Sequence, residues 1–362
     1  MIPDYLYTPI FYNLLLILTL ITAYQISQQA DITLRLKRKA ETPYWTWLFA
    51  ILLAVFMGFR PVSWVFVDTP TYARIFSVYQ TSDLSEINLV NDDYLFSMFM
   101  FYSSKIISVN WFFFIIDFIY IICPLLAIRK FYPNKEWLAF IVYIGAFSFW
   151  SAGTNGLRTG MACAVFLLAL SQINRKWLVI ILLFISVGIH KSMLLPVGAL
   201  VLSYFYRNSK TYIIIWLLAI PISFISGGFW ENLFAGLGVD ERLNYLTTEA
   251  DTKMFSSTGF RWDFLLYSAI PIIVGYYVVF IKKVTTSVYS FLLNIYIISN
   301  TFWILVITAN FSNRFAYLSW FLYPIVLLYP FIRFDFWENK SLKIALLLLL
   351  HFGFSYVMWL IG

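Results

Sequence analysis

The side chains that could do chemistry in this 362-residue sequence are single arginines, lysines and acids placed between long apolar runs. The basic residues at or near expected helix ends are Arg60, Arg158, Lys191, Arg261 and Arg314. A guanidinium group can bind two phosphate oxygens at once, and a cation in a membrane-embedded cavity needs an anionic partner. If these helix ends converge, the sequence predicts a site for an anionic group. The simpler alternative is contact with lipid headgroups.

Asp68 is the first candidate for a general base near these cations. It follows Arg60 by eight residues and precedes Tyr72 by four. A helix that begins at Pro70 would bring Asp68 and Tyr72 close together. The same position also suits an N-cap, because an Asp side chain there accepts a hydrogen bond from the first turn of the helix.

His190 is the second candidate base, and Lys191 follows it at an expected turn between two apolar runs. A neutral imidazole beside a cation and an anionic substrate could accept a proton or donate a hydrogen bond. A turn residue with a solvated side chain would explain the same position. His351 lies in the middle of an apolar run, which favours a buried histidine with a structural hydrogen bond.

Asp117 lies seven residues inside an apolar run, where an acid is costly and faces the interior of a helix bundle. It is therefore either functional or paired structurally. The two cysteines, Cys123 and Cys163, lie inside apolar runs and exclude a disulfide framework or a cysteine zinc site. Since the two histidines also lie in separate runs, we expect no protein-built metal site and no cofactor.

The elements that must position these residues are membrane-spanning helices. Hydrophobic residues make up 61% of the chain and charged residues only 12%, about half the charged fraction of soluble domains. This composition excludes a cytosolic enzyme, a secreted domain and a nucleic-acid-binding protein. About twelve crossings are predicted by the apolar runs 7–27, 45–59, 110–128, 137–152, 157–173, 177–189, 193–206, 211–229, 263–281, 288–309, 315–332 and 342–361. We expect one all-α integral membrane domain over residues 1–362.

Orientation follows from lysines and arginines, which concentrate on the cytoplasmic side of membrane proteins. A basic cluster at 35–39 follows the first run and no basic residue precedes that run, so we place the N-terminus outside. The long loops 60–93 and 230–262 then lie outside, which makes the outer face the expected functional surface. The stretch Tyr94–Tyr102 would reach only about 14 Å as a helix, against about 30 Å of hydrocarbon. We expect an amphipathic helix at the outer membrane surface there.

Four short motifs of polar and charged residues follow one another along the chain. They are Gly58-Phe59-Arg60 with Asp68-Thr69-x-x-Tyr72, Asn155-x-x-Arg158-x-Gly160-Met161-Ala162, His190-Lys191-Ser192 and Asn313-Arg314-Phe315-x-Tyr317. Their order and spacing resemble the EpsG family of Wzy-like membrane proteins. Thr159 departs from the glutamine that the family often has after the arginine. Asp93 matches an acidic residue that the family often has before an interfacial helix.

The resemblance implies a polymerase of bacterial exopolysaccharide, capsule or O-antigen, with a helical bundle similar to that of the GT-C glycosyltransferases. It also implies a location in the inner membrane and substrates built as oligosaccharide repeat units on undecaprenyl pyrophosphate, joined at the periplasmic or outer face. A chain-length regulator and a flippase are the further partners that it implies.

Such a transfer requires a stabilised pyrophosphate leaving group and a base for the attacking hydroxyl. We expect Arg158, Lys191 and Arg314 to bind the pyrophosphate, and Arg60 to support one of the lipid-linked chains. Asp68 is the preferred base and His190 the second choice. The residues expected to contact sugar or phosphate are Tyr72 and Tyr317.

Three other functions fit parts of the sequence. A GT-C glycosyltransferase that uses a polyprenyl-phosphate sugar is the nearest in chemistry, and Asp68 could serve as its acidic loop residue. A membrane O-acyltransferase would need a histidine reached by an acyl donor from the cytoplasm, whereas the unusual polar residues favour the outer side. A flippase for lipid-linked glycans should have charged residues along a cavity that opens to both faces of the membrane. The inner halves of the expected helices carry few charged residues.

Overall fold

The structure of the chain is a computed structural model that describes residues 2–28, 44–86, 93–236, 259–284, 286–309 and 312–361. Every regular element in these ranges is helical, which confirms the all-α fold. Six helices are long and apolar enough to cross a membrane, and five shorter apolar helices accompany them. The chain is a multi-pass membrane protein, and the expected number of about twelve crossings stays a prediction.

The helices fall into two compact units, residues 1–190 with 337–361 and residues 191–336. The helices of the first unit are α1 (Asp4–Ser27), α3 (Tyr44–Gly58), α4 (Thr69–Thr81), α5 (Tyr94–Ile106), α6 (Val109–Phe131), α7 (Glu136–Ile144), α8 (Phe149–Thr154), α9 (Leu157–Ser171), α10 (Lys176–Ile189) and α17 (Lys340–Ile361). Two short 3-10 helices, η1 (Trp64–Phe66) and η2 (Leu84–Glu86), flank α4. The expectation of one membrane domain stays a prediction.

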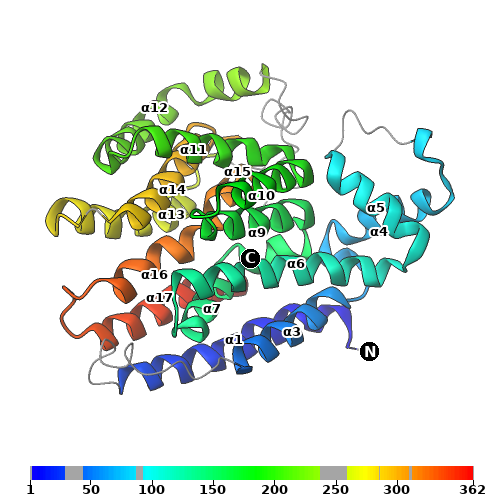
Figure 1. Ribbon diagram of the computed structural model, residues 1–362, viewed down its shortest axis with the longest axis horizontal. Coiled ribbons are helices and arrows are strands. Elements are labelled where there is room, and N and C mark those ends of the chain that lie inside the picture. Colours follow the sequence, from blue (N-terminus) through cyan, green and yellow to red (C-terminus); the bar gives the residue numbers. More distant parts are fainter. Residues whose placement is uncertain are drawn as a thin grey trace. The chain divides into compact units, whose positions relative to one another are not determined.

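Helix α6 is central to the first unit, because it packs against both α3 and α9 (Figure 1). It is apolar over nearly its whole length and ends at Phe131, two residues before Pro133, because a proline disfavours the helical conformation of the residue that precedes it. On its far side α9 packs against α10, while α1 packs against α17. Helices α4 and α5 form a pair, and α5 also contacts α10.

The apolar run 137–152 forms two short helices, α7 and α8, in place of the single crossing expected from its composition. Two side chains of α17 donate hydrogen bonds to the backbone carbonyls at the break. His351 Nε2 donates to Val142 O at 2.9 Å, and Ser355 Oγ donates to Gly145 O at 2.8 Å. Non-helical backbone is tolerated at membrane depth where the protein satisfies its polar groups. The expected structural role of His351 is confirmed.

Helix α5 covers the stretch that was expected to be an amphipathic helix, and it continues past Tyr102 to Ile106. Near its end, Lys105 Nζ donates to the carbonyls of Gln80 at 3.1 Å and Ser82 at 2.8 Å. This lysine therefore closes the C-terminal end of α4 and joins the two helices. The location of α5 at a membrane surface stays a prediction.

The second unit is arranged around α14. Its elements are η3 (Lys191–Met193), α11 (Leu194–Phe205), α12 (Ser209–Gly236), α13 (Trp262–Tyr276) with a π-helical turn η6 (Tyr277–Ile281), α14 (Ser287–Leu305), α15 (Asn313–Trp320) and α16 (Tyr323–Arg333). Helix α14 contacts α11, α12, α13, α15 and α16. Asn300 on α14 accepts from Trp216 Nε1 at 2.8 Å and donates to Ser319 Oγ at 3.0 Å, which links three helices through one buried amide.

The run 315–332 also divides, into α15 and α16, which begins at Tyr323 with Pro324 in its first turn. Proline has no N–H to donate backwards, so it suits the start of a helix and ends the preceding one. Together the two helices are long and apolar enough for one crossing.

Candidate functional site

Arg158 is the centre of the polar cluster in the first unit. It is the second residue of α9, and its Nε donates to the Tyr72 hydroxyl at 3.1 Å while Nη1 donates to Asp93 Oδ2 at 2.9 Å. The guanidinium carbon lies 5.7 Å from the ring centre of Tyr72 and 5.9 Å from that of Phe96. Arg158 thus contacts α4 and α5, and 27% of its side chain is exposed.

Asp93 is the residue that the sequence analysis did not include among the site residues. Its second oxygen, Oδ1, lies 3.2 Å from His190 Nδ1, so one carboxylate connects His190 to Arg158. A neutral imidazole that donates Nδ1–H to a carboxylate presents Nε2 as its proton acceptor. The signal for Asp93 was its match to the acidic residue that the EpsG family often has before an interfacial helix.

Three helix N-termini meet at this cluster, those of α4, α5 and α9. The residues that precede them are Asp68, Asp93 and Gly156; neither aspartate makes a side-chain hydrogen bond that caps its helix, and the glycine has no side chain to do so. The contacts of Arg158 with Tyr72 and Asp93 bring the first turns of the helices together. Uncapped N–H groups and the positive ends of helix dipoles favour anions. Backbone and side chain therefore both favour a negative ligand beside Arg158.

Two glycines permit the close helix contacts that bring these residues together. A Cβ at Gly188, near the end of α10, would lie 2.4 Å from Leu95 Cδ1, so α10 can approach the start of α5 here because the residue is glycine. A Cβ at Gly160 on α9 would lie 2.5 Å from the carbonyl oxygen of Ala152 on α8. The first contact places His190 beside Asp93, and the second places Arg158 close to the end of α8.

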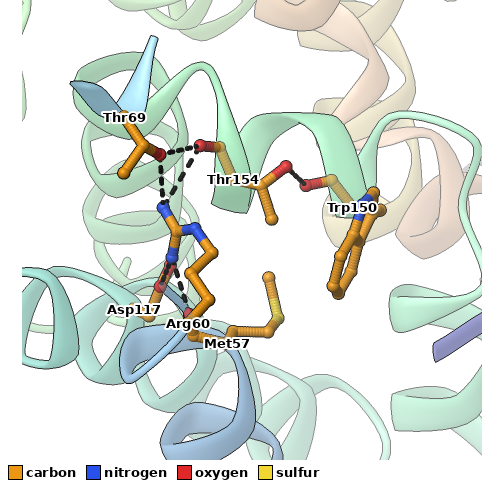
Figure 2. Close-up of polar contacts among 6 residues, drawn as sticks. All are labelled: Met57, Arg60, Thr69, Asp117, Trp150 and Thr154. Carbon is orange, nitrogen blue, oxygen red and sulfur yellow. Dashed lines mark hydrogen bonds and ion pairs between the residues drawn. The ribbon is translucent and has the colours of Figure 1, made fainter. Parts of the chain in front are cut away.

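Arg60 lies in a separate, fully buried network, which Figure 2 shows. Its Nη1 donates to Asp117 Oδ2 at 2.6 Å and to Met57 O at 2.7 Å. Its Nη2 donates to Thr154 O at 3.1 Å and to Thr69 Oγ1 at 3.3 Å. Asp117 is also fully buried, so the structural pairing that the sequence allowed for it is found.

This burial differs from the expectation that Arg60 supports a lipid-linked chain. Its side chain has no exposed surface among the described residues, and both terminal nitrogens donate to protein oxygens. A contact of Arg60 with a lipid-linked chain stays a prediction. The physical reason for the burial is Asp117: an intramembrane carboxylate needs a buried cation nearby. The sequence could not pair two residues 57 positions apart.

Helix α4 connects the buried network to Arg158. Thr69 accepts from Arg60 and donates to Thr154 O at 3.1 Å, and Tyr72, one turn further along α4, binds Arg158. Residues three apart lie on the same face of a helix. Arg60 thus positions α4 so that the Tyr72 hydroxyl meets the guanidinium of Arg158.

Asp68 lies immediately before α4 and is partly exposed. Its backbone carbonyl accepts from Tyr72 N at 3.1 Å, while its carboxylate makes no hydrogen bond with any residue in the described ranges. The alternative role as a capping side chain is therefore not seen, and Asp68 stays a candidate base.

The remaining expected site residues belong to the second unit. Lys191 begins η3, Arg314 is the second residue of α15, and Tyr317 follows one turn later with its ring 5.7 Å from that of Trp320. Arg314 is half-buried. Their expected convergence with Arg158 stays a prediction. In the ranges that the structure describes, no three His, Cys, Asp or Glu side chains are grouped as metal ligands.

Comparison with known proteins gives one match. The sequence model of the EpsG family matches residues 44–362, a range that contains every candidate site residue. No curated protein and no solved structure matches the chain.

Proposed function

The chain belongs to the EpsG family, and on this basis we propose that it is a polysaccharide polymerase of the bacterial inner membrane. Its donor is a glycan on undecaprenyl pyrophosphate and its acceptor is the next lipid-linked repeat unit, with the site facing the periplasm or the outside. The observation that supports this best is Arg158, a partly exposed guanidinium where three helix N-termini meet.

In the proposed transfer, the acceptor hydroxyl oxygen attacks the anomeric carbon at the pyrophosphate-bearing end of the donor glycan. A carbon–oxygen bond forms there while the bond to the phosphate oxygen breaks, and its electron pair leaves with the pyrophosphate. The hydroxyl proton passes to a base. Arg158 and the N–H groups of the helix termini stabilise the charge that develops on the leaving oxygen.

His190 is the base that the geometry favours, because Asp93 lies within hydrogen-bond distance of Nδ1 and so directs the accepting lone pair to Nε2. Asp68 is the alternative, since its partly exposed carboxylate precedes the helix that carries Tyr72. His190→Gln and Asp68→Asn separate the two: the base variant loses turnover, and the other keeps most of it.

We propose that Lys191 and Arg314 also bind the pyrophosphate, because Asp93 offsets part of the charge of Arg158 at 2.9 Å. Arg60 is a positioning residue in this scheme. Tyr317 contacts sugar or phosphate.

The test is a gel of surface and lipid-linked glycans from cells that lack the gene. Single repeat units should persist and the long ladder should disappear. An Arg158→Ala gene should not restore the ladder, although its product inserts normally. Arg74→Ala, an exposed arginine on α4 beside the site, is the matched control and should restore it.

A ladder that survives deletion with altered acylation or a missing side sugar would show that the protein is a modifying transferase. Full-length polymer made by the Arg158→Ala protein would remove Arg158 from the donor site.

A further inference from the structure

The Asp93 carboxylate connects the expected phosphate ligand to the candidate base. Oδ2 accepts from Arg158 Nη1 at 2.9 Å and Oδ1 lies 3.2 Å from His190 Nδ1. Only 8% of the Asp93 side chain is exposed, and His190 is 2% exposed. Charges shielded from water in this way interact strongly. A ligand that binds Arg158 therefore also changes how strongly the Asp93 carboxylate interacts with the His190 imidazole.

Arg158 and His190 compete for the negative charge of Asp93. While the guanidinium is bound to the carboxylate, Asp93 stabilises a protonated imidazole less well, because its charge is already neutralised. An incoming pyrophosphate needs the same guanidinium, whose Nε and Nη1 already donate to Tyr72 and Asp93. Two phosphate groups carry more negative charge than one carboxylate and bind a guanidinium in pairs of hydrogen bonds.

We infer that pyrophosphate displaces Asp93 from Arg158, and that the released carboxylate then pairs more strongly with His190. The inference rests on the proposed pyrophosphate donor. Asp93 is a positioning residue, because it acts on the acceptor hydroxyl through His190. The base becomes fully effective only when the donor is in place, which couples proton removal to donor binding.

The other polar groups of the first unit near Arg158 and Asp93 either favour the displacement of Asp93 from Arg158 or do not oppose it. The Tyr72 hydroxyl accepts from Arg158 and helps to hold it as Asp93 leaves. Asp68, one turn before Tyr72, adds a second negative charge near the start of α4.

The deciding variant is Asp93→Asn, studied as full-length protein in detergent micelles. Inorganic pyrophosphate binding is measured by calorimetry, and turnover with lipid-linked repeat units. Because the amide no longer competes for Arg158, pyrophosphate should bind about tenfold more tightly than to the wild type. Turnover should nevertheless fall about 100-fold or more, because His190 loses its counter-ion. A merely structural role for Asp93 would weaken both.

Asp83→Asn is the matched control, since Asp83 is an exposed acid after the end of α4, and it should change neither quantity. His190→Gln should lower turnover as Asp93→Asn does but leave pyrophosphate affinity within about threefold of the wild type. Pyrophosphate binding by Asp93→Asn that is equal to or weaker than that of the wild type would overturn the inference.

Should the Asp93→Asn protein fail to fold, proton uptake on pyrophosphate binding decides the matter. The wild type should take up more protons than His190→Gln when both are measured in buffers of different ionisation enthalpy. Equal uptake would overturn the coupling. Pyrophosphate binding that Arg158→Ala abolishes would still support the donor site, whereas no binding to the wild type would count against the proposed function itself.

Discussion

The Arg60 guanidinium and the Asp117 carboxylate form an ion pair with 2.6 Å between Nη1 and Oδ2, and neither side chain has any exposed surface. A buried ion pair is seldom more stable than a well-packed apolar pair, but the loss of one partner leaves an uncompensated charge. The pair therefore fixes geometry. It holds α3 against α6 and keeps the other end of the guanidinium directed at α4 and α8.

Asp117→Ala should lower the free energy of unfolding by about 3–5 kcal/mol, because Arg60 then stays charged and unpaired in the core. Reversible unfolding in mixed detergent micelles measures this change. The double variant Arg60→Met with Asp117→Leu should recover most of the loss, since it removes both charges. A single variant as stable as the wild type would show that water reaches Arg60.

Thr69→Val should lower the free energy of unfolding by about 1–2 kcal/mol, because the hydroxyl bonds to Arg60 and Thr154 are lost while the shape is kept. It should also shorten the polymer, since α4 no longer holds Tyr72 firmly against Arg158. Thr71→Val changes an exposed neighbour on the same helix and should have little effect on either quantity. Equal effects of the two variants would contradict the positioning role of α4.

Gly188→Val should reduce polymerisation, because the added side chain would overlap Leu95 and push α10 away from α5. Overpacking of this kind costs about 1–3 kcal/mol and would separate His190 from Asp93. A second change, Leu95→Ala, should restore activity by making room. Gly353→Val on α17, where a Cβ meets no atom within 4 Å, is the control. Failure of Leu95→Ala to rescue would show that the contact is not what limits activity.

His351→Leu should reduce stability by about 1–3 kcal/mol, because the carbonyl of Val142 at the end of α7 loses its donor. Polymer made per inserted molecule should change little. His190→Gln should do the opposite, with nearly normal stability and lost turnover. Since these are the two histidines of the chain, the pair of variants separates a structural imidazole from a functional one. A loss of turnover in His351→Leu beyond its loss of inserted protein would argue against this division.

The helices were largely predictable because a membrane-spanning helix corresponds to one continuous stretch of apolar residues in the sequence. The run 110–128 became α6, Val109–Phe131, and 177–189 became α10, Lys176–Ile189. The break between α7 and α8 was not predictable, because it depends on His351 and Ser355, side chains about 200 residues further along the chain. Without these two donors, the carbonyls of Val142 and Gly145 would need the backbone hydrogen bonds of a continuous helix.

The site was predictable only in part. Arg158 and His190 could be selected as candidates because a polar residue at the end of an apolar run is conspicuous. The connection between them was not, since Asp93 lies 65 residues from Arg158 and 97 from His190. The pairing of Arg60 with Asp117 was not predictable for the same reason. The sequence alone does not distinguish a basic residue at a helix end that faces a ligand from one that faces a buried acid.

The four acceptors of Arg60 also constrain how the chain is made. Met57 precedes the arginine, but Asp117 and Thr154 are synthesised much later, and Thr154 lies 94 residues downstream. Until those segments have been synthesised, most of the hydrogen-bond acceptors of Arg60 do not exist. The network around Arg60 can therefore close only after α8 has been made, which sets an order in which the helices of the first unit reach their final positions.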